Sequence, residues 1–126
     1  MEGLQPPPFA SALLVAVLLS VGNLVMLLTV RLAVNGSLPP GLLAGYRTAA
    51  TRSSDAAWIA AHRAALPVNR LGAVAGALLA VGTLPLAGTP GPYLFALALA
   101  VLVTLGHAVI GLVLAQRAAK RELGGE

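Results

Sequence analysis

The stretch FASALLVAVLLSVGNLVMLLTV, residues 9–30, carries no charged side chain from its first residue to its last. As an α-helix rising 1.5 Å per residue it would extend about 33 Å, enough to cross a hydrocarbon core of roughly 30 Å. Arg31 follows directly and supplies the first charge. The stretch therefore predicts a transmembrane helix over about residues 9–31.

The composition of the whole chain agrees with this prediction. Its 126 residues are 58% hydrophobic and only 10% charged, with a mean hydropathy of +0.89, whereas soluble domains are about 25% charged. Two further apolar stretches, residues 70–87 and 93–115, flank the uncharged turn GTPGP at residues 88–92. We expect one all-α membrane domain, residues 1–126, with three transmembrane helices and a C-terminal tail over 116–126.

The linker between the first two predicted spans, residues 35–69, begins with the turn sequence NGSLPPG. Further along, Ser54 is a suitable N-cap, Asp55 suits the first turn of a helix, and Pro67 is expected to end that helix near residue 65. The sequence thus predicts a short amphipathic helix over about 54–66, lying at the cytoplasmic membrane interface. Its polar and aromatic face carries Asp55, Trp58, Ile59, His62 and Leu66, and its opposite face is almost entirely alanine.

The distribution of basic residues predicts the orientation. Five of the eight Lys and Arg residues lie from Arg31 to Arg70, that is, in the linker or at the span ends next to it. Three follow the third span, and none precedes the first or occupies the 88–92 turn. By the positive-inside rule the N-terminus lies outside the plasma membrane, and the linker and C-terminus are cytoplasmic. The linker arginines are also placed to attract anionic lipid. Direct nucleic-acid binding is not expected, because no recognition motif accompanies the charge.

Small residues recur at helical spacing in the second and third spans. Gly72 and Gly76 form a G-x-x-x-G pair, and Ala100, Thr104 and Gly111 follow one side of the third span. Such seams let membrane helices approach closely. The contact could form within the chain or between copies in a homo-oligomer, and the sequence leaves both open.

Asn23 and His107 are the polar side chains that would be most costly to leave unpaired in lipid. The first and third spans run in the same direction, and the two residues lie at similar distances from the basic residues that follow their spans, so their depths match within roughly 3 Å. We predict that they meet, directly or through water. Both a packing pair and a proton or ligand site remain open.

The polar segment GYRTAATRSSDAAWIAAHR, residues 45–63, separates the apolar stretches and holds the only Trp. Its pattern resembles the linker of the SdpI family of bacterial membrane proteins, and the residues that carry the resemblance are Gly45, Arg47, Thr48, Thr51, Ser54, Trp58 and His62. The resemblance implies immunity to a secreted peptide toxin, and capture of a transcriptional repressor by a cytoplasmic surface such as residues 47–63. It also implies a local structure closed by Trp58, for instance with Arg47 stacked on the indole. The best-known member has more spans than the three expected here.

Other interpretations of this segment are less specific. Trp58 can be a membrane-interface anchor, and Arg47 and Arg63 can serve only topology and lipid contact. Ser54, Asp55 and His62 include the residue types of a catalytic triad, but one short helix supplies neither its geometry nor an oxyanion hole. We expect no enzyme activity, metal or cofactor. Two further hypotheses are an accessory subunit of a larger membrane complex and a transporter formed by oligomerisation, with Asn23 and His107 along its path.

Overall fold

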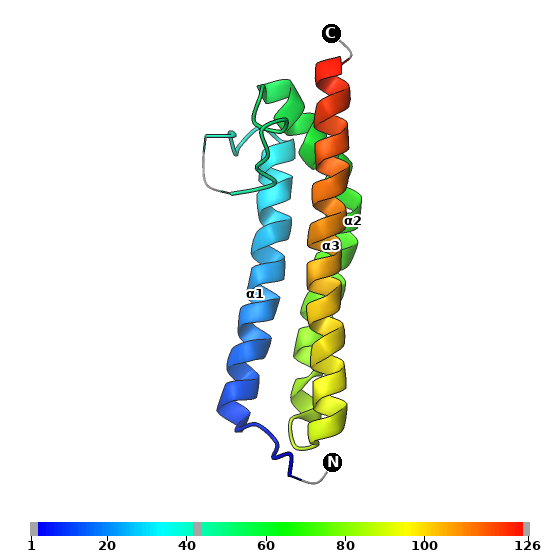
Figure 1. Cartoon of the computed structure of the whole chain (residues 1–126). Helices are drawn as coiled ribbons and strands as arrows, with labels where there is room; N and C mark the ends of the chain where they lie inside the picture. Colours follow the sequence, from blue (N-terminus) through cyan, green and yellow to red (C-terminus); the bar gives the residue numbers. More distant parts are fainter. Residues whose placement is uncertain (1–2, 42–43, 125–126) are drawn as a thin grey trace.

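The computed structural model describes residues 3–41 and 44–124 of the chain, and these residues form three long helices and no strand (Figure 1). The helices are α1 (Phe9–Val34), α2 (Asp55–Gly82) and α3 (Pro90–Gly124), with a short 3₁₀ helix, η1 (Leu84–Leu86), between the last two. Each long helix is long and apolar enough to cross a membrane. The prediction of an all-helical membrane protein with three spans is therefore confirmed.

Large and small side chains are distributed in the way expected of a bundle surrounded by lipid. Bulky residues such as Leu18, Leu71 and Leu102 are more than 60% exposed, whereas Ala16 and Ala100 are buried between helices. Lipid tails are as apolar as leucine, so helices in a membrane associate through close packing of small residues and through polar contacts. The exposed leucines therefore form the surface of the bundle that contacts the lipid tails.

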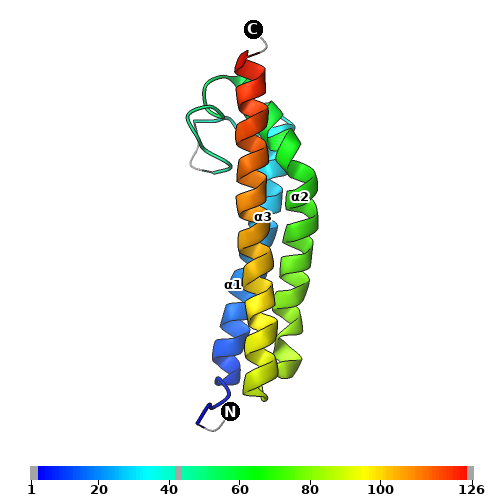
Figure 2. The same cartoon turned by 45° about the vertical axis from the view of Figure 1, so that its right-hand side comes forward.

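The middle helix organises the bundle. α2 packs along both α1 and α3, while α1 and α3 contact each other only sparsely. The segment over residues 35–54, described except for residues 42–43, is called the cap loop. It lies at one side of the bundle, near the end where α3 terminates, and α1 begins at the opposite end (Figures 1 and 2). The cap loop therefore packs against the side of the bundle, where its Tyr46 meets Gly111 of α3.

The prediction of a separate interfacial helix ending before Pro67 is wrong. Residues 55–66 are the first part of α2, which continues through Pro67 to Gly82. Proline removes one backbone hydrogen bond, and membrane helices tolerate this loss where packing holds the segments on both sides. Here Ala65 and Asn69 are completely buried on either side of it. Figure 1 shows the loop-side end of α2 inclined to its remainder, as a proline kink produces.

The alanine face of the N-terminal part of α2 is also packed. Ala57, Ala61 and Ala65 are fully buried in a cluster with Val30 of α1 and Ala115 of α3. The N-terminal part of α2 thus contacts helices through its alanines and the cap loop through its larger side chains. Its amphipathic pattern reflects two packing surfaces.

The third helix differs from its predicted limits at both ends. It begins at Pro90, because proline suits a first helical position, and it ends at Gly124, well inside the expected tail of residues 116–126. Ala119 is fully buried in the same cluster as the α2 alanines. This packing holds the helix for more than a turn beyond residue 115.

Candidate functional site

The cap loop is fastened to the bundle by side chains from the predicted motif. The indole Nε1 of Trp58 donates to the carbonyl oxygen of Leu38 at 2.8 Å, and Arg47 Nη1 donates to that of Pro40, also at 2.8 Å. Both contacts satisfy backbone acceptors in a segment whose two prolines cannot continue a helix. Trp58 is therefore a structural closure of the loop, with its ring 1% exposed.

His62 connects the loop to α2 through both ring nitrogens. The backbone N–H of Tyr46 donates to Nε2 at 2.9 Å, and Nδ1 lies 2.8 Å from the carbonyl oxygen of Trp58. Because Nε2 accepts, the proton must lie on Nδ1, and the ring is a neutral Nδ1–H tautomer. The Trp58 and His62 ring centroids are 4.1 Å apart. The partner found on the Trp58 ring is thus His62, whereas the sequence suggested Arg47.

Gly45 is the residue that lets the loop approach these rings. Its φ is +96°, and a Cβ built there would lie 2.7 Å from His62 Nε2 and 3.0 Å from Trp58 Cη2. Both the backbone conformation and the available space favour glycine. The need for glycine at position 45, the first residue of the motif, therefore follows from the close approach of Trp58 and His62, its last two residues.

The two threonines of the motif organise the turn after Tyr46. The Thr51 hydroxyl donates to the carbonyl oxygen of Tyr46 at 2.7 Å and accepts from the Thr48 N–H at 2.8 Å. The Thr48 hydroxyl in turn hydrogen-bonds to the side-chain carbonyl of Gln116 on α3. Thr51 is completely buried. The threonines therefore tie the loop to itself and to α3.

The remaining motif residues begin α2 or face outward. Ser54 Oγ accepts from the Ala57 N–H at 3.0 Å, so the predicted N-cap is confirmed, and Asp55 occupies the first turn. Asp55 and Arg63 are exposed, as is Arg52. The exposed charged side chains in this part of the chain are therefore Arg52, Asp55 and Arg63.

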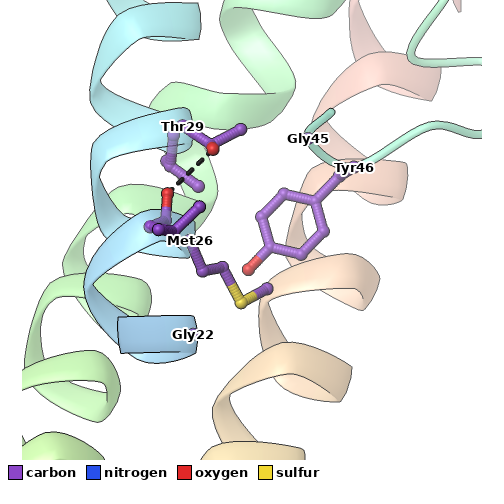
Figure 3. Close-up of a pocket in the computed structure, with 7 residues that line it drawn as sticks. Gly22, Met26, Thr29, Gly45 and Tyr46 are labelled. Atoms are coloured by element: carbon purple, nitrogen blue, oxygen red, sulfur yellow. Dashed lines mark hydrogen bonds between the residues drawn. The ribbon is translucent and has the colours of Figure 1, made fainter. Parts of the chain in front are cut away.

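Tyr46 occupies the centre of the arrangement and points into the bundle. Its ring is 5% exposed and forms one wall of a pocket of about 190 Å³ that is lined mainly by α1. Figure 3 shows its hydroxyl directed toward the side chain of Met26. Burial raises the pKa of the Tyr46 hydroxyl, and the Asn69 side chain opposes part of that increase. The tyrosine therefore remains a neutral phenol.

The predicted meeting of Asn23 and His107 is confirmed, and it is direct: His107 Nε2 lies 2.7 Å from Asn23 Oδ1. Asn23 Nδ2 donates to the Leu19 carbonyl oxygen and to Thr104 Oγ1, both at 2.9 Å. Thr104 can accept because its own hydroxyl donates to the Ala100 carbonyl oxygen. Asn23 Oδ1 is thus the acceptor, and His107 is a neutral Nε2–H tautomer.

The small residues of the two predicted seams pack against other elements of the same chain. A Cβ at Gly72 would lie 2.1 Å from His107 Cβ, one at Gly76 would lie 2.9 Å from Asn23 Nδ2, and one at Gly111 would lie 2.2 Å from the Tyr46 hydroxyl oxygen. Each of the three glycines therefore accommodates a polar or aromatic side chain from another element. The intrachain alternative for the G-x-x-x-G pair is the one observed.

The sequence prediction did not single out three residues of this site: Tyr46, Asn69 and Gln116. Tyr46 lies inside the motif, and its neighbour Gly45 was the available signal for a close approach. Asn69 is a polar residue just before a span, and its complete burial follows from the continuous α2. Gln116 lay in the predicted tail. All three depend on tertiary contacts between the loop and the helices.

The arrangement offers no assembled catalytic or metal-binding geometry among the residues that the structure describes. No group of three or more His, Cys, Asp or Glu side chains in that part of the chain could hold a metal ion. Ser54 caps α2, and both nitrogens of His62 are engaged by backbone groups. The described features define a three-helix membrane bundle whose cap loop is fastened to its side.

Comparison with known families identifies this class more closely. The model of the SdpI/YfhL protein family matches residues 37–115, which include most of the cap loop, all of α2 and most of α3. The chain belongs to the SdpI/YfhL family, as the motif predicted. No curated protein and no solved structure matches the chain. Asn23 and the rest of α1 precede the matched residues.

Proposed function

We propose that this chain is a non-enzymatic immunity protein that protects its cell from a secreted peptide toxin. Family membership over residues 37–115 is the observation that carries the proposal. The three apolar helices, each long enough to cross a membrane, support the proposal of a membrane-embedded immunity protein. The motif residues support a mechanical role, because they hold the cap loop against the side of the bundle.

The proposed orientation places the cap loop and the C-terminus in the cytoplasm, with the N-terminus outside. All eight Lys and Arg residues lie from Arg31 to Arg70 or after residue 115, and neither residues 1–8 nor the 88–92 turn has any. The asymmetry follows the positive-inside rule. In this orientation the exposed arginines can also contact anionic lipid, at about 1 kcal/mol per residue.

Signal relay through this end of the protein is the finer part of the proposal. A cytoplasmic repressor would contact exposed side chains, and within residues 47–63 these include Arg52, Asp55 and Arg63. Trp58 and His62 are buried and would act by holding the surface in shape. A toxin that disturbs the bundle could alter that surface through the cap loop.

The rival hypothesis of an accessory subunit depended on exposed small-residue seams. Gly72, Gly76 and Gly111 instead pack against side chains of the same chain. The seams are therefore already occupied, and the immunity proposal is preferred.

Survival of toxin-challenged cells tests the immunity proposal. A sensitive bacterium expressing the chain is exposed to the secreted peptide toxin that the best-known family members neutralise, and colony counts are compared with those of cells carrying an empty vector. Protection supports immunity. Equal killing, with the protein shown to be present in the membrane, would contradict it.

The relay part has its own test, with a photoreactive residue at position 63 and a control at Leu78, which is 67% exposed near the opposite end of α2. A soluble DNA-binding protein crosslinked from position 63 and absent from position 78 supports relay. Lipid alone from both positions would contradict it. A larger membrane complex captured from both would favour the accessory-subunit hypothesis.

A further inference from the structure

Four buried side-chain atoms near the centre of the site have no hydrogen-bond partner among the residues that the structure describes. They are Tyr46 Oη, both amide atoms of Asn69, and His107 Nδ1. The three residues are at most 5% exposed and come from the cap loop, α2 and α3. Buried polar atoms are nearly always paired with protein groups or ordered water, and lipid offers no alternative partner.

The three side chains lie at neighbouring levels of the bundle. His107 packs on Gly72, and Tyr46 Oη packs on Gly111, which is one turn from His107 on the same face of α3. Asn69 precedes Gly72 by three residues on α2. Because α2 and α3 are antiparallel, Asn69 lies opposite Gly111, where the tyrosine hydroxyl is seated.

Tyr46 and Asn69 lie close together. The Asn69 side chain opposes part of the rise that burial causes in the tyrosine pKa, as a hydrogen-bonding neighbour does, but the two groups are placed so that neither has a hydrogen bond of acceptable distance and angle. A water molecule between the two groups would satisfy both where the direct bond is poorly formed. Asn69 is completely enclosed, so such a water would be internal.

The hydrogen-bonding capacities of the three groups match those of water. His107 donates from Nε2 to Asn23, so its Nδ1 presents a lone pair. Asn69 presents one acceptor and an amide donor, and the Tyr46 hydroxyl both donates and accepts. A water molecule makes two to four hydrogen bonds and can join a lone pair, a carbonyl and a hydroxyl.

We propose that Tyr46, Asn69 and His107 form a buried water-binding site at the junction of the cap loop with α2 and α3. Tyr46 closes the site on the loop side. On the other side His107 continues it into the hydrogen bonds of Asn23 and Thr104. The site thus links the family motif to the polar pair in the middle of the membrane, and it does not depend on the immunity proposal.

The three asparagines of the chain make a direct test possible. The full-length protein, labelled with ¹⁵N on asparagine side chains and reconstituted in lipid bilayers, is studied by water-edited solid-state NMR. Asn35 is exposed and serves as the positive control, whereas the Asn23 amide is bonded to protein acceptors and serves as the negative control. We expect strong magnetisation transfer from water to Asn69, several-fold faster than to Asn23.

Two results would overturn the proposal. Transfer to Asn69 as slow as that to Asn23, together with a direct contact to the Tyr46 hydroxyl, would mean that the two side chains bond without water. Deuterium exchange at Asn69 as fast as that at Asn35 would mean that the site is open to bulk water; we expect exchange at least tenfold slower.

A variant pair tests the assignment of Tyr46. Tyr46→Phe removes one partner of the water and should weaken the transfer to Asn69 by about half or more. Tyr93→Phe alters a buried tyrosine at the opposite end of the bundle and should leave the transfer unchanged. An unchanged Asn69 signal in Tyr46→Phe would remove Tyr46 from the site.

Discussion

Gly72→Ala should force α2 and α3 apart at the point where His107 packs. The added methyl carbon would lie 2.1 Å from His107 Cβ and 2.4 Å from its Cγ, whereas carbon atoms in ordinary contact are about 3.5–4.0 Å apart. The helices must therefore shift by more than about 1 Å, and the 2.7 Å bond from His107 to Asn23 tolerates little displacement.

The net change in stability is the loss from overpacking and from the broken polar contact, minus the gain in helix propensity. Overpacking costs about 1–3 kcal/mol and a lost polar contact between membrane helices about 0.6 kcal/mol, while alanine in place of glycine returns about 1 kcal/mol of helix propensity. We expect a net loss of about 1–2 kcal/mol. Gly106→Ala is the matched control, because it gains the same propensity next to His107 and its Cβ meets nothing within 4 Å.

The assay is unfolding by sodium dodecyl sulfate from mixed micelles, followed by the fluorescence of Trp58 and by circular dichroism. Trp58 is the only tryptophan of the chain and is buried in the native state. Gly72→Ala should unfold at lower detergent fraction than the wild type, and Gly106→Ala at the same or a higher fraction. Equal stability of the two variants would refute the packing argument.

Two further predictions concern the cap loop and use the same unfolding assay. Gly45→Ala should destabilise the protein by at least about 1 kcal/mol more than Gly36→Ala. Both glycines have positive φ, but only a Cβ at position 45 would meet other atoms. Equal effects of the two variants would show that backbone strain alone matters. Thr51→Val should lower the stability by about 1–3 kcal/mol, because it removes a buried hydroxyl bonded to the Tyr46 carbonyl oxygen. The control Thr89→Val removes an exposed hydroxyl and should lower the stability much less. A similar loss of stability in both variants would contradict the assigned role of Thr51.

Features that depend on local chemistry or on helical period were predictable from the sequence. The charge-free run of residues 9–30 is sufficient for a span. Ser54 had the side chain and position of an N-cap. Asn23 and His107 could be paired because both are polar groups in lipid at matching depth. In each case one strong physical constraint acts on a few neighbouring residues.

Features that depend on tertiary packing were not predictable in the same way. Pro67 normally ends a helix, yet burial of Ala65 and Asn69 on either side maintains α2 through it. The insertion of Tyr46 follows from contacts of the loop with His62 and Gly111, which are distant in sequence. No periodicity of a loop encodes such contacts.

The central claim is that His62 fastens the cap loop to α2, and ¹⁵N NMR of the two histidines in lipid bilayers tests it most directly. The structure predicts opposite tautomers, with the proton of His62 on Nδ1 and that of His107 on Nε2. It also predicts a correlation across the hydrogen bond between His62 Nε2 and the Tyr46 amide. A proton on His62 Nε2, or the absence of any contact with the Tyr46 amide, would contradict the account.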